Sequence, residues 1–219
     1  MRTNADGLAN RDIDGTRVLA TRGSPVYGEP TADGWRAWSV RRSKLGGMLD
    51  REMAIHLTNE SRVLYLGASS GTTVSHLADV VEVVYAVEFA PRPMADLLDV
   101  AAARENVIPL LKDARQPESY AHVVESDIDL VVQDVATRNQ AGVALANRQF
   151  LRPGGQLALA IKARSEDVTA SPDETYEIAL ETLEVGYDIE ATERLDPTHR
   201  DHLGIVARRP ADDERTEAL

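Results

Sequence analysis

The sequence has no cysteine among its 219 residues, which excludes disulfide bonds and thiolate metal sites and fits a protein of a reducing cytoplasm. No apolar run approaches the roughly 20 residues that a membrane-spanning helix needs. The first residues, MRTNADGLANRD, lack the apolar core of a secretory signal. We therefore expect a cytoplasmic protein that does not bind a membrane.

Lysine is also scarce, with three lysines against 21 arginines in a chain of net charge −12. One interpretation is compositional drift that leaves an anion-repelling surface. The arginine bias favours another interpretation, adaptation to a salty cytoplasm in which hydrated carboxylates keep the protein dissolved. A lysine then persists where a compact charge with a shiftable pKa is needed, which arginine cannot supply. Lys44 and Lys162 are candidates for such a role.

The chain divides into four segments. Short strand-like runs broken by glycine and proline predict a small β-rich domain over residues 1–40. Apolar side chains at helical spacing over 41–57 predict a linking helix that carries Lys44. Residues 58–209 alternate strand and helix patterns, and residues 210–219 form a charged tail.

The alternation over 58–209 indicates an α/β fold with a mostly parallel sheet covered on both faces. Strand patterns lie at 62–67, 81–88, 106–111, 128–134 and 155–162, followed by an antiparallel pair at 187–195 and 202–209. Helix patterns fill the intervals, for example at 138–151. In such sheets ligands bind beyond the carboxyl ends of the strands, so the residues at those ends are the candidate site.

Three of these strand ends carry an acidic residue. Glu88, Asp113 and Asp134 follow successive strands, and a glycine-containing loop, Gly67 to Thr73, follows the first one. The loop has Ser69 where a dinucleotide fingerprint needs its middle glycine, so a pyrophosphate cradle is not expected. Three carboxylates favour a cationic ligand over a diphosphate. The alternative is that Asp113 or Asp134 only caps the next helix.

Two further side chains lie at the same predicted edge. Lys162 ends an apolar strand, although it could instead be a lysine whose stem extends out of the sheet to water. His202 begins the last strand. His199 and His202 have a spacing that could suit a metal, but no further ligands accompany them, so no metal site is expected.

The order of motifs resembles the fibrillarin family over roughly residues 16–209. The matching segments are YGE (27–29), WSVRRSKL (38–45), VLYLGASSGTT (63–73), VYAVEF (84–89), DVA (134–136), IKA (161–163) and RDH (200–202). The chain lacks the Gly/Arg-rich extension of eukaryotic fibrillarins and is similar to the archaeal form; its acidity suggests a haloarchaeon. It departs from the family pattern D-V-A-Q at Thr137, with Gln140 nearby.

This resemblance implies a Rossmann-like class I methyltransferase fold, with a seven-stranded sheet and S-adenosylmethionine as donor. The implied donor-site residues are Gly67, Ala68, Ser69, Gly71, Thr72, Thr73, Glu88, Phe89, Asp113, Ala114, Asp134, Val135, Ala136 and Thr137. The implied catalytic set is Lys44, Asp134, Lys162 and His202. We expect Asp134 to hold Lys162, which would orient the acceptor hydroxyl or accept its proton, while Lys44 and His202 position the ribose or its phosphate.

The same resemblance implies an RNA-guided methyltransferase that modifies ribose 2′-hydroxyls of ribosomal or transfer RNA. Its expected partners are a box C/D guide RNA, the target RNA, a scaffold protein and a kink-turn-binding protein. An acidic chain has little general attraction for RNA, which is consistent with partners that supply the basic surface. A small-molecule methyltransferase and a non-catalytic assembly subunit of the same fold stay open as alternatives. A nicotinamide dehydrogenase is the weakest candidate, because the glycine loop lacks its fingerprint.

Overall fold

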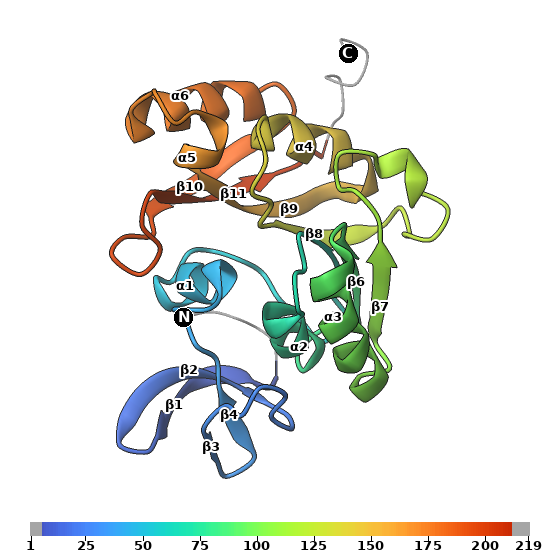
Figure 1. The fold of residues 1–219 in the computed structure, drawn as a ribbon, viewed down its shortest axis with the longest axis vertical. Helices are drawn as coiled ribbons and strands as arrows, with labels where there is room; N and C mark the ends of the chain where they lie inside the picture. Colours follow the sequence, from blue (N-terminus) through green and yellow to red (C-terminus); the bar gives the residue numbers. More distant parts are fainter. Residues whose placement is uncertain (1–5, 212–219) are drawn as a thin grey trace.

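The computed structural model describes residues 6–211, so most of the predicted charged tail lies outside the described residues. Figure 1 shows two parts, a small sheet near the N-terminus and a larger layered body. No helix among the described residues has both the length and the apolar character needed to cross a membrane.

The small part is an antiparallel sheet in the order β1-β2-β4-β3. Its strands are β1 (Leu8–Ile13), β2 (Thr16–Arg22), β3 (Thr31–Ala32) and β4 (Trp35–Ala37). Ile13, Ala20 and Trp35 form a small apolar cluster of its own. The sequence patterns indicated β2 and β4 but not β1, whose inner residues are polar or small.

The larger body contains a seven-stranded sheet in the order β10-β11-β9-β8-β5-β6-β7. Its strands are β5 (Arg62–Leu66), β6 (Val83–Glu88), β7 (Val107–Leu111), β8 (Ile128–Gln133), β9 (Leu151–Lys162), β10 (Asp188–Arg194) and β11 (His202–Arg208). Strands β5 to β9 pair in parallel, and β10 and β11 add antiparallel at one edge. The predicted mostly parallel, seven-stranded architecture with a small β-rich part is confirmed.

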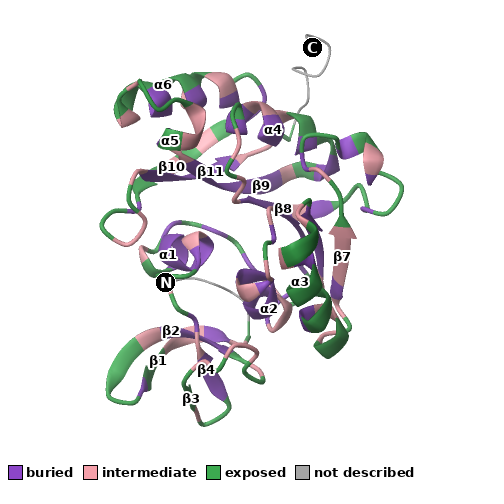
Figure 2. Cartoon of the chain, viewed as in Figure 1, coloured by how far each residue is buried: buried purple, intermediate pink, exposed green. Residues whose placement is uncertain are grey.

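Helices cover both faces of this sheet (Figure 1). One face carries α1 (Lys44–Asp50), α2 (Thr72–Ala78) and α3 (Pro91–Ala103), and the other carries α4 (Gln140–Asn147), α5 (Ala163–Glu166) and α6 (Pro172–Leu183). Short 3₁₀ turns lie at Pro117–Ser119 and Arg148–Phe150. Two large apolar clusters, one on each face, enclose the central strands, which are mostly buried (Figure 2).

The linking helix is shorter than the predicted 41–57, because α1 ends at Asp50. Glu52 adopts a left-handed conformation, with φ of 59°. The Glu52 N–H donates to the Leu49 carbonyl and the Met53 N–H donates to the Met48 carbonyl, which is the Schellman arrangement that ends a helix. Glycine usually occupies this left-handed position, so the glutamate gave no sequence signal for the helix end.

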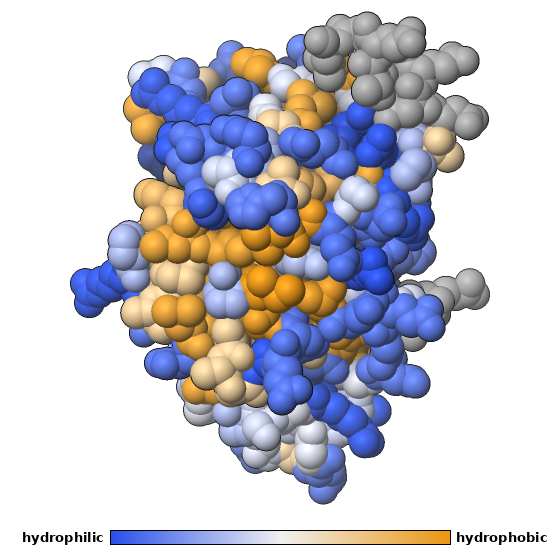
Figure 3. Space-filling model, turned by 90° about the vertical axis from the view of Figure 1, so that its right-hand side faces the viewer, coloured by the Kyte–Doolittle hydropathy of each residue, from blue (hydrophilic) through white to orange (hydrophobic). Residues whose placement is uncertain are grey.

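One of the two edges of the seven-stranded sheet is strand β7, and the other is β10. Val84 donates to the Asn106 carbonyl and Lys112 donates to the Glu88 carbonyl, so even-numbered residues of this stretch bond to β6 and odd-numbered ones face outward. Pro109 is one of the odd-numbered residues, and it has no N–H. The open edge of β7 therefore lacks a donor at this position, which disfavours pairing with another strand. Figure 3 shows apolar surface on the side that carries β7 and α3, where Leu98 and Leu111 are exposed.

Candidate active site

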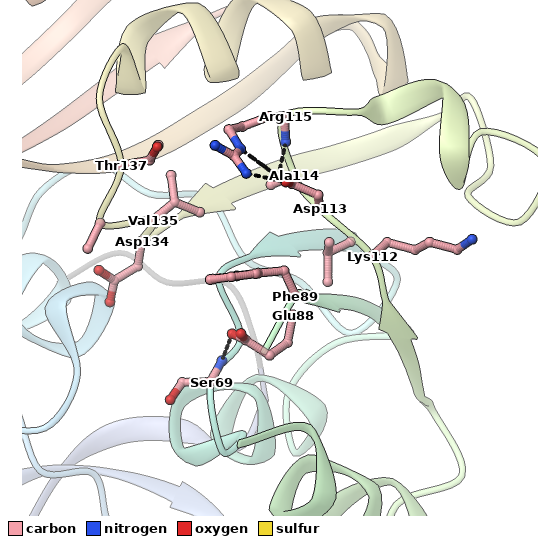
Figure 4. A pocket seen from close by; sticks show the side chains of 13 residues that line it. Ser69, Glu88, Phe89, Lys112, Asp113, Ala114, Arg115, Asp134, Val135 and Thr137 are labelled. Atoms are coloured by element: carbon pink, nitrogen blue, oxygen red, sulfur yellow. Dashed lines mark hydrogen bonds and ion pairs between the residues drawn. The ribbon is translucent and has the colours of Figure 1, made fainter. Parts of the chain in front are cut away.

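A cavity of about 300 Å³ opens at the carboxyl ends of four parallel strands (Figure 4). Its lining comes from the segments after β5, β6, β7 and β8. These residues are Gly67, Ser69, Val87, Glu88, Phe89, Lys112, Asp113, Ala114, Arg115, Asp134, Val135, Ala136 and Thr137. The volume lies within the range of small-molecule sites.

The strand order reverses at β5, because β6 and β7 extend the sheet on one side of it and β8 lies on the other, and ligands bind at such a point. At this point the loop after β5 passes very close to the end of β8. Gly67 has φ of +83°, and a Cβ on it would lie 2.3 Å from the Asp134 carbonyl oxygen. Only glycine allows this approach, which brings the β5 loop and Asp134 to the same cavity.

Glu88 is a buried carboxylate that holds two loops in place. Its Oε2 accepts a hydrogen bond from the Ser69 N–H and its Oε1 accepts one from the Ala90 N–H, both at 2.8 Å. Each carboxylate oxygen has a second lone pair, so Glu88 can still accept hydrogen bonds from a ligand. The Phe89 ring, 67% exposed, extends across the cavity in Figure 4 and offers a flat apolar surface.

Asp113 is paired with Arg115, an interaction that the sequence patterns did not predict. The Arg115 side chain and its backbone N–H donate to both carboxylate oxygens. The side-chain hydrogen bond from Arg115 is the main reason why the pKa of Asp113 is lowered. Asp113 therefore stays ionised while its charge is largely offset. Lys112 contributes to the cavity wall, but its ammonium group points away from it (Figure 4).

A second cavity, of about 360 Å³, adjoins the first and shares Asp134, Val135 and Ala136 with it. All four residues of the expected catalytic set line this second cavity, although α1, β8, β9 and β11 are far apart in the sequence. Its lining consists of Lys44, Asp134, Val135, Ala136, Lys162, Thr198, His199, Arg200 and His202.

The ion pair at this junction differs from the expected one. The Lys44 ammonium lies 2.9 Å from a carboxylate oxygen of Asp134. Within residues 6–211, no ion pair joins Asp134 to Lys162, so the expectation that Asp134 holds Lys162 was wrong. Lys44 comes within reach because it begins α1, whereas Lys162 lies on β9 opposite His202 of β11.

His202 is a buried imidazole with a defined tautomer. Its Nδ1 lies 2.8 Å from the Arg200 carbonyl oxygen, which can only accept, so Nδ1 carries the proton. Burial is the main cause of its lowered pKa, and the positive charge of Lys44 lowers that pKa further. The neutral ring therefore keeps an unprotonated Nε2 with a lone pair. Neither Asp113 nor Asp134 caps the next helix, since Gln116 is the N-cap of the 3₁₀ turn after Asp113 and Asn139 is the N-cap of α4.

Four expected donor-site residues do not line either cavity, namely Ala68, Gly71, Thr72 and Thr73. Gly71 caps α2 in a left-handed conformation, where a Cβ would lie 2.8 Å from Leu97. The Thr73 hydroxyl donates to the Ser43 hydroxyl at 2.9 Å, and Ser43 caps α1. Gly71 and Thr73 thus position the loop and helix around the cavities.

Some residues of the two cavities were missed by sequence reasoning, namely Val87, Lys112, Arg115, Thr198, His199 and Arg200. Val87 and Arg200 belong to the matching segments themselves, and the other four lie within two residues of a matching segment or an expected site residue, which is the signal that could have found them. His199 also supports the site, because its Nε2 lies 2.7 Å from the Val40 carbonyl, just before α1. Within the described residues, no cluster of three or more histidine or acidic side chains could hold a metal ion.

Gln140 does not take the place of the glutamine expected at position 137. It is fully buried, and Thr137 itself lines the first cavity. The departure from the family pattern at Thr137 therefore leaves a hydroxyl at this point of the wall. The Gln140 side chain instead bonds to the backbone of Lys162.

Comparison with known proteins shows the family of the chain. Residues 10–211 match the family model of fibrillarin. A fibrillarin-like rRNA/tRNA 2′-O-methyltransferase of Halorubrum lacusprofundi is 60% identical over 201 residues, covering 92% of this chain and 95% of the relative. The corresponding protein of Halobacterium salinarum is 60% identical over 196 residues, covering 90% and 92%.

Solved structures give the same result. The fibrillarin of a fibrillarin/Nop5p complex superposes with a TM-score of 0.87 at 41% identity, covering 93% of this chain and 97% of that one. Aeropyrum pernix fibrillarin with natively bound S-adenosyl-L-methionine has a TM-score of 0.78 at 40% identity, covering 94% and 99%. Because the family model covers residues 10–211 and a 60% identical relative covers 92% of the chain, the chain belongs to the fibrillarin family.

Proposed function

We propose that this chain is the catalytic subunit of a box C/D ribonucleoprotein and methylates ribose 2′-hydroxyls of ribosomal RNA, transfer RNA or both. The observation that carries the proposal is the junction of two cavities at Asp134 to Ala136. One cavity has the walls of a donor site, and the other collects two lysines, an aspartate and a neutral histidine. The names of the 60% identical relatives support the same reaction.

The first cavity fits S-adenosylmethionine by its chemistry. Glu88 has free lone pairs for the two ribose hydroxyls, and the Phe89 ring is placed to stack on the adenine. Ser69, Asp113 and Thr137 supply further polar groups along the wall. Asp134 lies where the cavities meet and would face the cationic side of the donor. When bound, the donor supplies a methyl group already activated by its positive sulfur.

The second cavity would hold the acceptor ribose. Lys162 has no carboxylate partner among residues 6–211, so its ammonium is available to orient the 2′-oxygen and to stabilise the negative charge that develops there. His202 offers the Nε2 lone pair that can accept the hydroxyl proton. Lys44 holds Asp134 in place and adds positive charge near the target phosphate. Positioning of the two substrates would supply most of the rate.

The net charge of −12 argues that other molecules bring the RNA to this site. We propose that a scaffold protein of the kind present in the fibrillarin/Nop5p complex docks this chain, with a kink-turn-binding protein on the guide RNA. Guide–target pairing would then select the nucleotide. With RNA as its substrate and no cysteine in the chain, we place the protein in the cytoplasm.

The test is methyl transfer in a reconstituted particle in molar KCl. The chain is combined with a scaffold protein, a kink-turn binder, a box C/D guide, its target and labelled S-adenosylmethionine. We expect label on one guided 2′-oxygen, and loss of that label when the guide is omitted. Lys162→Arg should be strongly impaired although it keeps the charge, because the guanidinium is wider than an ammonium group. The control is Arg17→Lys, which exchanges the same two residue types at an exposed position of β2 and should retain activity.

Label that appears without guide RNA, or on a free metabolite, would contradict the proposal and favour a small-molecule methyltransferase. Equal rates for the unsubstituted chain and Lys162→Arg would leave the guided reaction standing but would contradict the role given to Lys162. Donor binding without any transfer in the complete particle would indicate a non-catalytic assembly subunit.

A further inference from the structure

On the side of β9 that faces β8, Lys162 lies beyond the last residue that pairs with β8. The last pair of the β8–β9 ladder joins Gln133 to Leu159, three residues before Lys162. On the other side the ladder continues, with Lys162 opposite His202. The backbone that carries the lysine therefore needs another partner on the β8 side, because an unpaired buried N–H or C=O is costly.

The side chain of Gln140 supplies that partner. Its Oε1 accepts a hydrogen bond from the Lys162 N–H at 3.0 Å, and its Nε2 donates to the Lys162 carbonyl at 3.1 Å. The side-chain amide of Gln140 therefore makes the two hydrogen bonds that a residue of β8 would make if that strand extended as far as Lys162. Gln140 is fully buried, with 0% of its surface exposed, so water does not compete for these bonds.

Gln140 is itself held from two directions. Its backbone carbonyl accepts from the side-chain amide of Gln133 at 2.7 Å, and its N–H donates to Glu166 at 2.5 Å. Gln133 directly precedes Asp134 in the chain. A continuous path of covalent and hydrogen bonds therefore runs from the segment of Asp134, through Gln133 and Gln140, to the backbone of Lys162.

We propose that Gln140 is a positioning residue that fixes Lys162 relative to the Lys44–Asp134 ion pair. The inference rests on the proposed function, in which the Lys162 ammonium acts on the acceptor oxygen. Gln140 touches neither cavity, so it would act only through the lysine. A small displacement of a catalytic group has a large effect on rate, which is why a buried amide far from the substrate can matter.

Gln140→Met has a similar size but cannot make either hydrogen bond. In the reconstituted particle at saturating donor and target, it should lower the single-turnover rate about tenfold or more, with the KM values of both substrates nearly unchanged. Gln140→Glu keeps the acceptor for the Lys162 N–H and should fall between Gln140→Met and the unsubstituted chain. Gln149→Met makes the same change at an exposed position in the 3₁₀ turn Arg148–Phe150, just after α4, and should have no effect.

A double-mutant cycle with Lys162→Ala separates positioning from general damage. If Gln140 acts through the lysine, Gln140→Met should hardly slow the Lys162→Ala chain further. An equal loss in both backgrounds, or a loss confined to KM, would overturn the proposal.

A readout without catalysis is amide hydrogen exchange in the full chain. The Lys162 amide should be protected in the unsubstituted protein and exchange faster in Gln140→Met, while the Leu159 amide stays protected. Unchanged Lys162 protection in Gln140→Met would overturn the positioning role. Hydrogen exchange tests the role of Gln140 without any methyl transfer. Lack of activity in the particle that contains the unsubstituted chain would contradict the proposed function, not the role of Gln140.

Discussion

His202 differs from an ordinary surface histidine in that its two ring nitrogens have different surroundings. Nδ1 donates to the Arg200 carbonyl, whereas Nε2 has no hydrogen-bond partner among residues 6–211, and the residue lines the second cavity. The lowered pKa keeps the ring neutral at neutral pH. In the proposed reaction this neutral ring accepts the hydroxyl proton, so protonation of His202 should abolish its contribution.

The rate of guided methyl transfer should therefore fall with decreasing pH as His202 gains its proton. Because its pKa is lowered, the midpoint should lie below the ordinary histidine value of 6.5. His202→Gln should remove this acidic limb and lower the plateau rate about a hundredfold. A pH profile of the single-turnover rate checks both effects. The exposed His56→Gln should leave the profile unchanged, and an acidic limb that persists in His202→Gln would assign the limb to another group.

At the scale of elements, α1 is a seven-residue helix that must be held by its ends because it is too short to be stable alone. Its N-cap, Ser43, accepts from the Gly46 N–H and from the Thr73 hydroxyl on α2. Lys44 is the first residue of the helix and reaches Asp134 from there. Ser43 thus links α2 to the Lys44–Asp134 ion pair at the junction of the two cavities.

Ser43→Ala should lower the free energy of unfolding by about 1 kcal/mol and should also slow methyl transfer, because Lys44 loses its fixed starting point. Urea unfolding and single-turnover rates give the two numbers. The matched control is the exposed Ser39→Ala, four residues earlier. A stability loss with an unchanged rate would mean that the cap holds the helix but does not position Lys44.

The sequence predicts the elements better than it predicts their contacts. Alternating strand and helix patterns were enough for the parallel sheet, and the position of Glu88, Asp113 and Asp134 after strands was enough to place them at one edge. The end of α1 was missed because a glutamate adopts the left-handed conformation. The pairing of Lys44 with Asp134, and the bonds of Gln140, join residues whose approach depends on packing, which no local pattern reveals.

At the scale of the whole molecule, the small sheet is attached to the larger body by buried polar contacts. The Arg36 guanidinium, fully buried, pairs with Glu29 of its own segment and with Asp79, which follows α2. His76 of α2 stacks on Trp38, with ring centroids 4.8 Å apart, and bonds to the Thr21 hydroxyl at 2.7 Å. Breaking one member of such a network leaves buried charge without a partner.

Burial lowers the pKa of His76 to about 2, and the charges of Arg36 and Arg104 contribute. The unfolded chain takes up a proton on this histidine below its ordinary value of 6.5, whereas the folded chain does not. Stability should therefore fall as pH drops below that value, by up to about 1.4 kcal/mol per pH unit for this one group.

His76→Phe keeps the stacking partner for Trp38 and removes the titration. It should be less stable than the unsubstituted chain at pH 7, with a gap that narrows as pH falls. Urea unfolding between pH 7 and 5 at constant salt measures the gap. The exposed His122→Phe should track the unsubstituted chain across this range, and a constant gap for His76→Phe would show that His76 titrates alike in both states.

The three carboxylates around the cavities are all held by groups of the chain itself: Glu88 by two backbone N–H groups, Asp113 by Arg115 and Asp134 by Lys44. A ligand that enters such a site does not have to order its walls, so little conformational entropy is lost on binding. We therefore expect the isolated subunit to bind its methyl donor without help from the other members of the particle.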